Sequence, residues 1–256
     1  MILSRITRAI REQNWFAVGL EFVIVIAGVV FGFQVTEWNT GRQDRREEAA
    51  VLSAMLEDTS HSIEVAASVA VLIGDQLAAL ERLTLVSDQP PEQDLPDGFQ
   101  IDLHTGVFVF SLYNPQMLTF DDLRQSGRLA LIRSRDIRRR LQEIDAIHAG
   151  IAETRADIVS VYYEFSDPYL IEHFDLRQTT FLPSAHSGNP GLEWLSPDEN
   201  LRDLRAVARQ REFQNILLYR GFIITGYRGQ IERVIDHYAG LETALRERLA
   251  TLGERA

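Results

Sequence analysis

The chain contains no cysteine and no lysine, and it has only 8 prolines among its 256 residues. Without cysteine it can form no disulfide and no cysteine-ligated zinc site, and it has no thiol nucleophile. Its 26 basic side chains, all arginine, are outnumbered by 37 aspartates and glutamates, which gives a formal net charge of −11. Nucleic-acid binding draws on a clustered basic surface, so we expect no nucleic-acid partner.

Long apolar segments are equally scarce, since only residues 15–36 are long and apolar enough to cross a bilayer. Trp15 and Trp38 lie at the two ends, and we expect them to be interface anchors because aromatic rings favour the headgroup region. A cleaved signal peptide is the alternative, but it has a shorter apolar run and a small-residue cleavage site. The polar residues after Val35 favour an uncleaved signal anchor.

The orientation of this anchor rests on charge. Three arginines precede it and three follow it closely, so the arginine count alone does not decide the topology. The free amino terminus adds positive charge to the short side, and a long following domain can be translocated regardless of its charge. We predict a single-pass protein of the bacterial inner membrane, with residues 1–14 as a cytoplasmic tail, residues 15–36 as the transmembrane helix and residues 37–256 as a periplasmic domain.

One face of this helix carries an acid and two glycines. Gly28 and Gly32 form a G-x-x-x-G step, which lets two helix backbones approach closely. Glu21 precedes them at offsets that return to nearly the same azimuth, and an acid inside a membrane is costly without a partner. We predict that Glu21, Gly28 and Gly32 form a transmembrane docking face for another transmembrane helix. The alternative is that the glycines reflect ordinary membrane-helix composition and that Glu21 leans toward the headgroups or is protonated.

Three later regions carry apolar residues at alternating steps of four and three, which predicts long amphipathic helices. Their stripes begin at Leu52, Ile137 and Phe213. Such stripes leave water by packing on one another. We therefore predict an all-α fold, with one N-terminal transmembrane helix followed by an elongated antiparallel helical bundle. Residues 99–112 fit either a small hairpin or a short buried helix.

Two sequence blocks resemble a group of uncharacterised bacterial single-pass membrane proteins. The first matches the group's N-terminal Gly-x-Glu…Gln-x-x-x-Trp-Asn transmembrane signature, through Gly19, Glu21, Gln34, Trp38 and Asn39. The second is similar to the group's Thr-x-x-x-Leu-x-x-Ser-Gly-x-Leu-x-x-Ile segment, through Thr119, Leu123, Ser126, Gly127, Leu129 and Ile132. The resemblance implies a membrane-anchored, mainly helical protein. It brings no reaction and no catalytic residues.

Catalytic and metal-binding patterns are missing from the sequence. The six histidines include no Glu-x-x-His of the kind that bundle di-metal sites use, and no G-x-S-x-G, H-E-x-x-H or P-loop occurs. We predict no enzyme activity, no catalytic residue, no metal and no cofactor. Three polar residues, His148, Arg155 and Arg220, do lie on the apolar stripes. They predict a buried polar layer or a pocket lining, or else structural pairs with acids and arginine stems that reach the bundle edge.

These features favour a non-enzymatic, membrane-anchored interaction protein, either an accessory subunit or a self-associating component of an inner-membrane assembly. The expected partners are membrane lipid and another transmembrane helix, from a second copy or from a different subunit. An aromatic cluster in residues 162–174 is expected to lie in the core or to contact a partner. The alternative function is a periplasmic ligand-sensing helical bundle that signals through a separate output partner.

Overall fold

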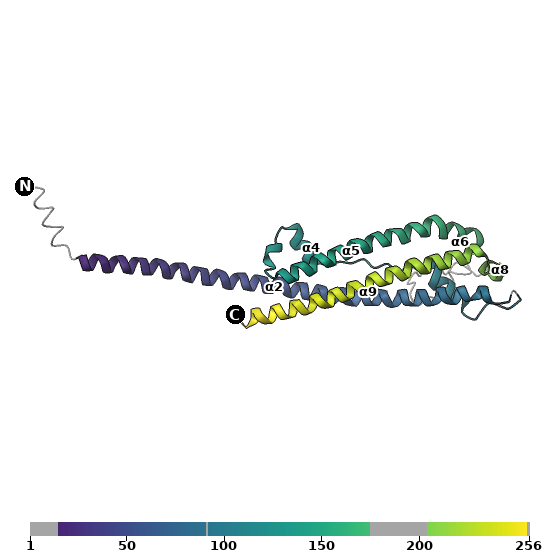
Figure 1. Cartoon of the computed structure of the whole chain (residues 1–256), viewed down its shortest axis with the longest axis horizontal. Coiled ribbons are helices and arrows are strands. Elements are labelled where there is room, and N and C mark those ends of the chain that lie inside the picture. The colour runs from purple at the N-terminus through teal and green to yellow at the C-terminus, as the bar shows by residue number, and fades with distance from the viewer. Residues whose placement is uncertain (1–14, 91, 175–203, 255–256) are drawn as a thin grey trace, which may run out of the picture.

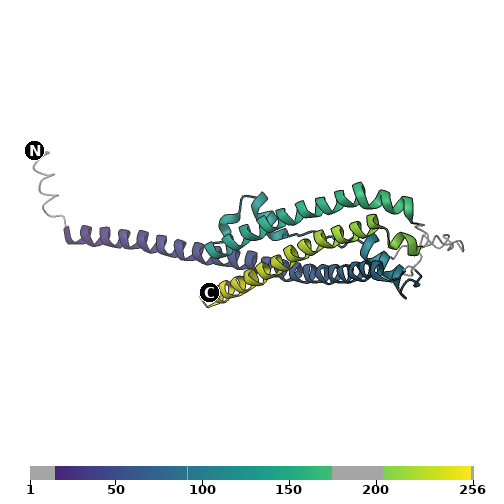
Figure 2. The same ribbon diagram turned by 45° about the vertical axis from the view of Figure 1, so that its right-hand side comes forward.

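The computed structural model describes residues 15–90, 92–174 and 204–254, and within them the fold is all-α, with no strand (Figure 1). Three long helices make up most of it, α2 (Trp15–Leu85), α5 (Arg135–Val161) and α9 (Arg211–Gly253). α9 packs along both of the others. It runs antiparallel to them, whereas α2 and α5 are parallel to each other (Figures 1 and 2). The predicted elongated helical bundle is confirmed.

The N-terminal part of α2 leaves the bundle as a free rod (Figure 1). From Gly19 onward it is long and apolar enough to cross a membrane, and none of its most apolar stretch is buried in the protein. Phe22, Phe31 and Phe33 are among its exposed aromatic side chains. An apolar surface of this length requires a cover of lipid or protein. The predicted tail, residues 1–14, lies outside the described residues.

The predicted apolar stripes face the interior of the bundle. Along α2 the buried positions recur every seven residues, at Leu52, Thr59, Ala66, Ile73 and Leu80. Along α5 they are Ile137, Leu141, Ile144, Ile151 and Ile158. On α9 the stripe runs from Phe213 to Leu252 as expected, except that Leu217 is buried and its neighbour Ile216 is only partly covered. Helical periodicity therefore locates most of the core that the three long helices contribute, whereas the segments between them add further buried residues.

Residues 99–108 are helical, so the hairpin alternative is wrong and the short buried helix is correct. The short helix α3 (Phe99–Leu103) continues into a π-helical turn, η2 (His104–Phe108). Phe99, Leu103 and Val107, each four residues apart, are all buried, and both elements pack on α2. A Cβ atom at Gly106 would lie 3.2 Å from the backbone nitrogen of Leu80. Glycine at this position thus permits the close packing.

Residues 109–117 then form no regular secondary structure and bury Tyr113 and Met117. The segment ends at α4 (Leu118–Gln125), whose first turn is capped from α2, because the backbone N–H of Thr119 donates to Asp58 Oδ2 at 2.7 Å. Ser134 caps α5 by accepting from the N–H of Ile137 at 3.3 Å. The first cap ties the start of α4 to α2, and the second fixes the first turn of α5.

Five short elements complete the described chain. A 3-10 turn, η1 (Val86–Asp88), follows α2, and another, η3 (Leu129–Leu131), precedes α5. α5 passes through a π-helical turn, η4 (Tyr162–Ser166), directly into α6 (Asp167–His173). The last is α8 (Leu204–Ala208), which precedes α9. α6 and α8 lie at the end of the bundle farthest from the free rod (Figure 1).

Candidate functional site

The free rod carries the predicted docking face. Glu21, Gly28 and Gly32 are all exposed, and a Cβ atom added at either glycine would meet nothing within 4 Å. No described residue forms a hydrogen bond or an ion pair with the Glu21 carboxylate. The helix therefore presents an acid and an open glycine strip along one side, with no part of its own bundle against it.

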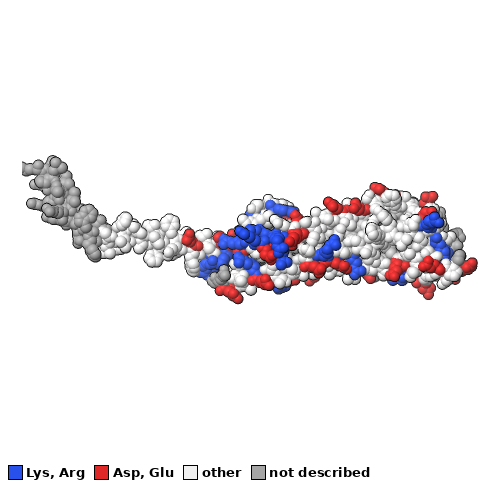
Figure 3. All heavy atoms as spheres, in the orientation of Figure 1, with Lys and Arg blue, Asp and Glu red and all other residues white. Residues whose placement is uncertain are grey.

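The two tryptophans predicted as interface anchors bracket this rod. Trp15 begins α2, but its side chain lies outside the described residues. Trp38 is exposed, and the Arg42 guanidinium carbon lies 4.8 Å from its ring centroid, within cation–π range. On the face shown in Figure 3, charged side chains of both signs cover the bundle, and arginines gather at the bundle end next to the rod.

Inside the bundle, His148 joins a hydrogen-bonded group of tyrosines. His148 Nε2 lies 2.5 Å from the Tyr238 hydroxyl, which lies 3.2 Å from the Tyr113 hydroxyl. The Tyr227 hydroxyl accepts from the Tyr113 N–H at 2.8 Å and donates to the Tyr113 carbonyl at 3.2 Å. Burial lowers the pKa of His148 and raises the pKa of all three tyrosines. The group is therefore uncharged at neutral pH and binds residues 109–117 to α5 and α9.

Arg155 and Arg220 have other partners, so the three predicted polar residues do not form one network. Arg155 is partly exposed, and its Nη1 donates to Asn114 Oδ1 at 2.7 Å. Arg220 is only 7% exposed, and its Nη2 donates to the Val109 carbonyl at 2.6 Å. Both arginines bond directly to residues 109–117, the segment between the helices, whereas His148 is linked to that segment only through Tyr238 and Tyr113.

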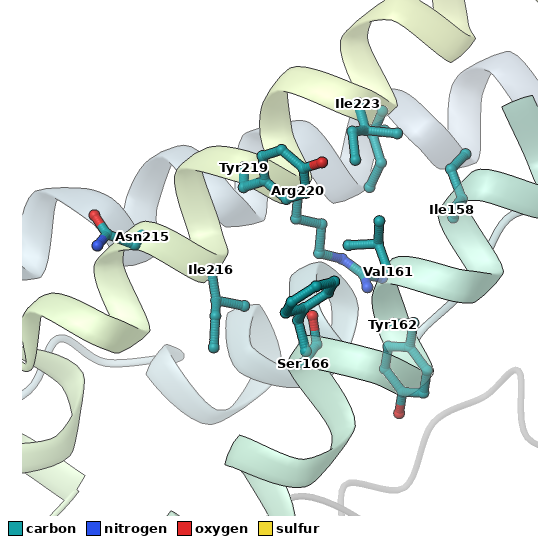
Figure 4. A pocket seen from close by; sticks show the side chains of 11 residues that line it. Ile158, Val161, Tyr162, Ser166, Asn215, Ile216, Tyr219, Arg220 and Ile223 are labelled. Carbon is teal, nitrogen blue, oxygen red and sulfur yellow. The ribbon is translucent and has the colours of Figure 1, made fainter.

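A cavity of about 260 Å³ opens beside Arg220, between α9 on one side and α5 and η4 on the other (Figure 4). Its lining is mostly apolar, with Ile158 and Val161 on α5 facing Ile216, Ile223 and Ile224 on α9. The Arg220 side chain reaches from α9 toward Val161 and Tyr162 (Figure 4). The cavity thus combines hydrocarbon walls with one buried cation.

The aromatic cluster beside this cavity is only partly core. Phe174 is buried, and Tyr162 and Tyr169 pack against the core, but Tyr163 and Phe165 are 65% and 63% exposed. On α9 the exposed side chains nearby include Leu218, Tyr219 and Phe222, the last at 78%. Of these exposed side chains, Phe165 and Tyr219 line the cavity, so exposed aromatic side chains lie at its mouth.

The sequence did not indicate the tyrosine group, and it predicted a pocket lining only as one alternative for the three polar stripe residues, of which Arg220 lines the cavity. A signal for the first was available, since a tyrosine at a buried stripe position requires a hydrogen-bond partner for its hydroxyl. No comparable signal marks the position of the cavity, because apolar residues such as those in its walls occur throughout the three long helices. Among the described residues, no three histidines, aspartates or glutamates are placed to hold a metal ion.

Comparison of the chain with known proteins gives no match: no family model, no curated protein and no solved structure matches it.

Proposed function

We propose that the protein is a non-enzymatic, membrane-anchored interaction protein, an accessory subunit or a self-associating component of a bacterial inner-membrane assembly. The single observation that carries this proposal is the free rod of α2. Its apolar surface has no cover from the rest of the described chain, and one side of it presents Glu21, Gly28 and Gly32. The occupant of that side is a transmembrane helix of a second copy or of another subunit.

Glu21 supports lateral docking because of its chemistry. A carboxyl group in a membrane helix is costly unless it finds a hydrogen-bond donor or a cation, and no described residue of this chain supplies one. A neighbouring helix can do so at close range, because the two glycines let the backbones approach. The acid and the glycine strip therefore support the same partner.

The proposed topology places residues 1–14 in the cytoplasm and the bundle in the periplasm. In this arrangement the apolar rod lies in the inner membrane and Trp38 lies at its outer interface, where Arg42 packs on the exposed indole ring. The bundle then stands in the periplasm and is available for contacts beyond the bilayer.

The docking face can be tested by replacing a glycine with leucine. Gly28→Leu inserts a bulky side chain into the strip and should lower the association constant about tenfold, equivalent to roughly 1.4 kcal/mol. The matched control is Gly19→Leu, since Gly19 lies on the opposite side of the helix and is equally open. Blue-native electrophoresis of gently solubilised membranes reports the assembly.

Because the chain has no cysteine of its own, disulfide cross-linking of single introduced cysteines provides a second test. In an otherwise cysteine-free chain, Val25→Cys lies near the docking face and Val30→Cys lies on the opposite side. If the chain self-associates, oxidation should link copies of the Val25→Cys variant and leave the Val30→Cys variant unlinked. A native assembly that is monomeric, or one that Gly28→Leu leaves intact, would contradict docking through this face.

A further inference from the structure

Arg220 carries a buried charge whose hydrogen bonds are incomplete. The residue is 7% exposed, and its Nη2 donates to the Val109 carbonyl at 2.6 Å. Its Nε is buried and has no hydrogen-bond partner, and its Nη1 forms no hydrogen bond with a described residue. A buried donor without an acceptor is costly, and more so when it belongs to a charged group.

The surroundings of the guanidinium compensate its charge only in part. Its central carbon lies 4.6 Å from the Phe110 ring centroid and 6.0 Å from that of Tyr162. The ring faces and one carbonyl supply partial negative charge, but no described carboxylate forms an ion pair with Arg220. Burial lowers the pKa of Arg220 to about 10, so the group is still a cation at neutral pH. The site therefore favours an anion.

The size and lining of the cavity indicate the chemical nature of the rest of the ligand, beyond its anionic group. At about 260 Å³ the space is smaller than the 300–1,000 Å³ typical of drug-sized ligands. Its isoleucine and valine side chains make most of the lining apolar and suit a hydrocarbon chain. Besides Arg220, the polar side chains of the lining are Tyr162, Ser166, Asn215 and Tyr219. A wider hollow of about 740 Å³ shares Val161, Tyr219 and Ile223 with it and continues along the same two helices. A chain can therefore extend outward past the exposed aromatic side chains at the mouth.

We propose that this cavity binds a medium-chain alkyl carboxylate. The carboxylate lies against the Arg220 guanidinium, and the hydrocarbon chain lies between Val161 and Ile158 on α5 and Ile216 and Ile223 on α9. A charge-assisted hydrogen bond from the guanidinium holds the head group, and the apolar walls hold the chain. The site is separate from the transmembrane docking face, so either proposal can fail without the other.

The test compares octanoate with 1-octanol, its uncharged analogue, on the full chain in lipid nanodiscs. Hydrogen exchange followed by mass spectrometry localises the effect, which separates binding in the cavity from uptake into the lipid. Octanoate should slow exchange in peptides that cover residues 158–166 and 215–224. It should do so at about one tenth of the concentration that 1-octanol requires, because only octanoate engages the buried cation.

Two variants separate the contributions of head group and chain. Arg220→Met keeps an apolar stem of similar length and should abolish the preference for octanoate. Arg233→Met, at an exposed position of the same helix, is the matched control and should preserve it. Ile216→Trp fills the cavity and retains the Arg220 cation, so it should weaken the binding of both octanoate and 1-octanol. If Arg220→Met does not fold, Ile216→Trp still tests whether the ligands bind in the cavity.

Octyl phosphate forms a further arm of the test. If octyl phosphate binds as well as octanoate, and its binding also depends on Arg220, then the site accepts lipids with a phosphate head group as well as alkyl carboxylates. Equal protection by octanoate and 1-octanol, or an octanoate preference that survives in Arg220→Met, would overturn the proposal. Arg220 would then be a structural cation that the aromatic rings and the Val109 carbonyl satisfy.

Discussion

His148 shows at the level of single residues how this bundle accommodates polar groups. Its ring contacts the Tyr238 hydroxyl, and the chain of hydrogen bonds continues to Tyr113 and Tyr227. A buried polar group left without a partner costs about 1–3 kcal/mol, so the group as a whole strongly disfavours alternative positions of the extended segment. The tyrosines thereby fix the register of residues 109–117 against α9.

The burial of His148 makes stability depend on pH. Burial lowers its pKa below the ordinary 6.5, against a smaller opposing effect of Asp145 and Asp121. The unfolded chain then binds a proton at pH values where the folded chain does not, so unfolding is favoured as the pH falls through 6.5 and below. Well above that value both states are neutral and the contribution vanishes. The midpoint of thermal unfolding, followed by circular dichroism, should therefore be lower at about pH 5.5 than at about pH 8.

The variant His148→Gln should show a smaller decrease over the same range, and His61→Gln, at an exposed position, should behave like the natural chain. An unchanged decrease in His148→Gln would show that other groups control the pH dependence.

The identity of the polar stripe residues could be read from the sequence, but their partners could not. His148, Arg155 and Arg220 follow directly from helical spacing. Val109 and Asn114, which accept from the two arginines, belong to a segment without periodicity, so nothing local fixes which atoms they present to the helices.

At the level of elements, one ion pair links the two longest helices near the free rod. Glu48 of α2 is 1% exposed, and its two carboxylate oxygens accept from Arg248 of α9 at 3.1 and 2.9 Å. The same carboxylate accepts from the backbone N–H of Arg133 at 3.3 Å. The pair therefore joins α2, the last turns of α9 and the approach to α5.

Loss of the arginine should destabilise the bundle strongly. Arg248→Met leaves Glu48 as a buried carboxylate without its cation, which we expect to cost about 3 kcal/mol in the free energy of unfolding, a low value for a buried pair because Arg248 is partly exposed. Arg246→Met is the matched control, since its exposed pair with Glu242 is worth less than about 1 kcal/mol. Urea denaturation measures both. Equal losses in the two variants would mean that burial of Glu48 has no special importance.

The elements themselves were largely predictable, because spacing decides which residues of a long helix are buried. The three stripes predicted the bundle, and the seven-residue recurrence from Leu52 to Leu80 predicted the inner face of α2. The secondary structure of residues 99–112 could not be predicted from the sequence, because apolar residues there satisfy both an alternating and a four-residue spacing. Contact with α2 stabilises the helix, and glycine at position 106 leaves room for the close approach to Leu80.

At the scale of the whole molecule, the described residues form a rod joined to a bundle (Figure 1). The proposed topology predicts which parts of the chain are exposed to protease. Protease added to spheroplasts should degrade residues 37–256 and leave a tag on residues 1–14 intact, because the bundle then lies outside the inner membrane. Alkaline carbonate should leave the intact chain in the membrane pellet. The control is a cytoplasmic protein, which should stay undigested while the spheroplasts are intact. If the bundle is cut only after lysis, the orientation is the opposite of the proposed one.

Because α2 is one continuous helix, it sets the distance between the proposed transmembrane segment and the Arg220 cavity. Ile73 of α2 and Arg220 line the same small space. In the proposed topology, with residues 15–36 in the bilayer, Ile73 lies about 55 Å along α2 from the end of the transmembrane segment, at 1.5 Å per residue. In the proposed topology, a molecule bound at Arg220 would arrive through water, whereas a helix that contacts Glu21 would arrive laterally through the lipid. The single continuous helix α2 would then link an aqueous site to a site in the membrane.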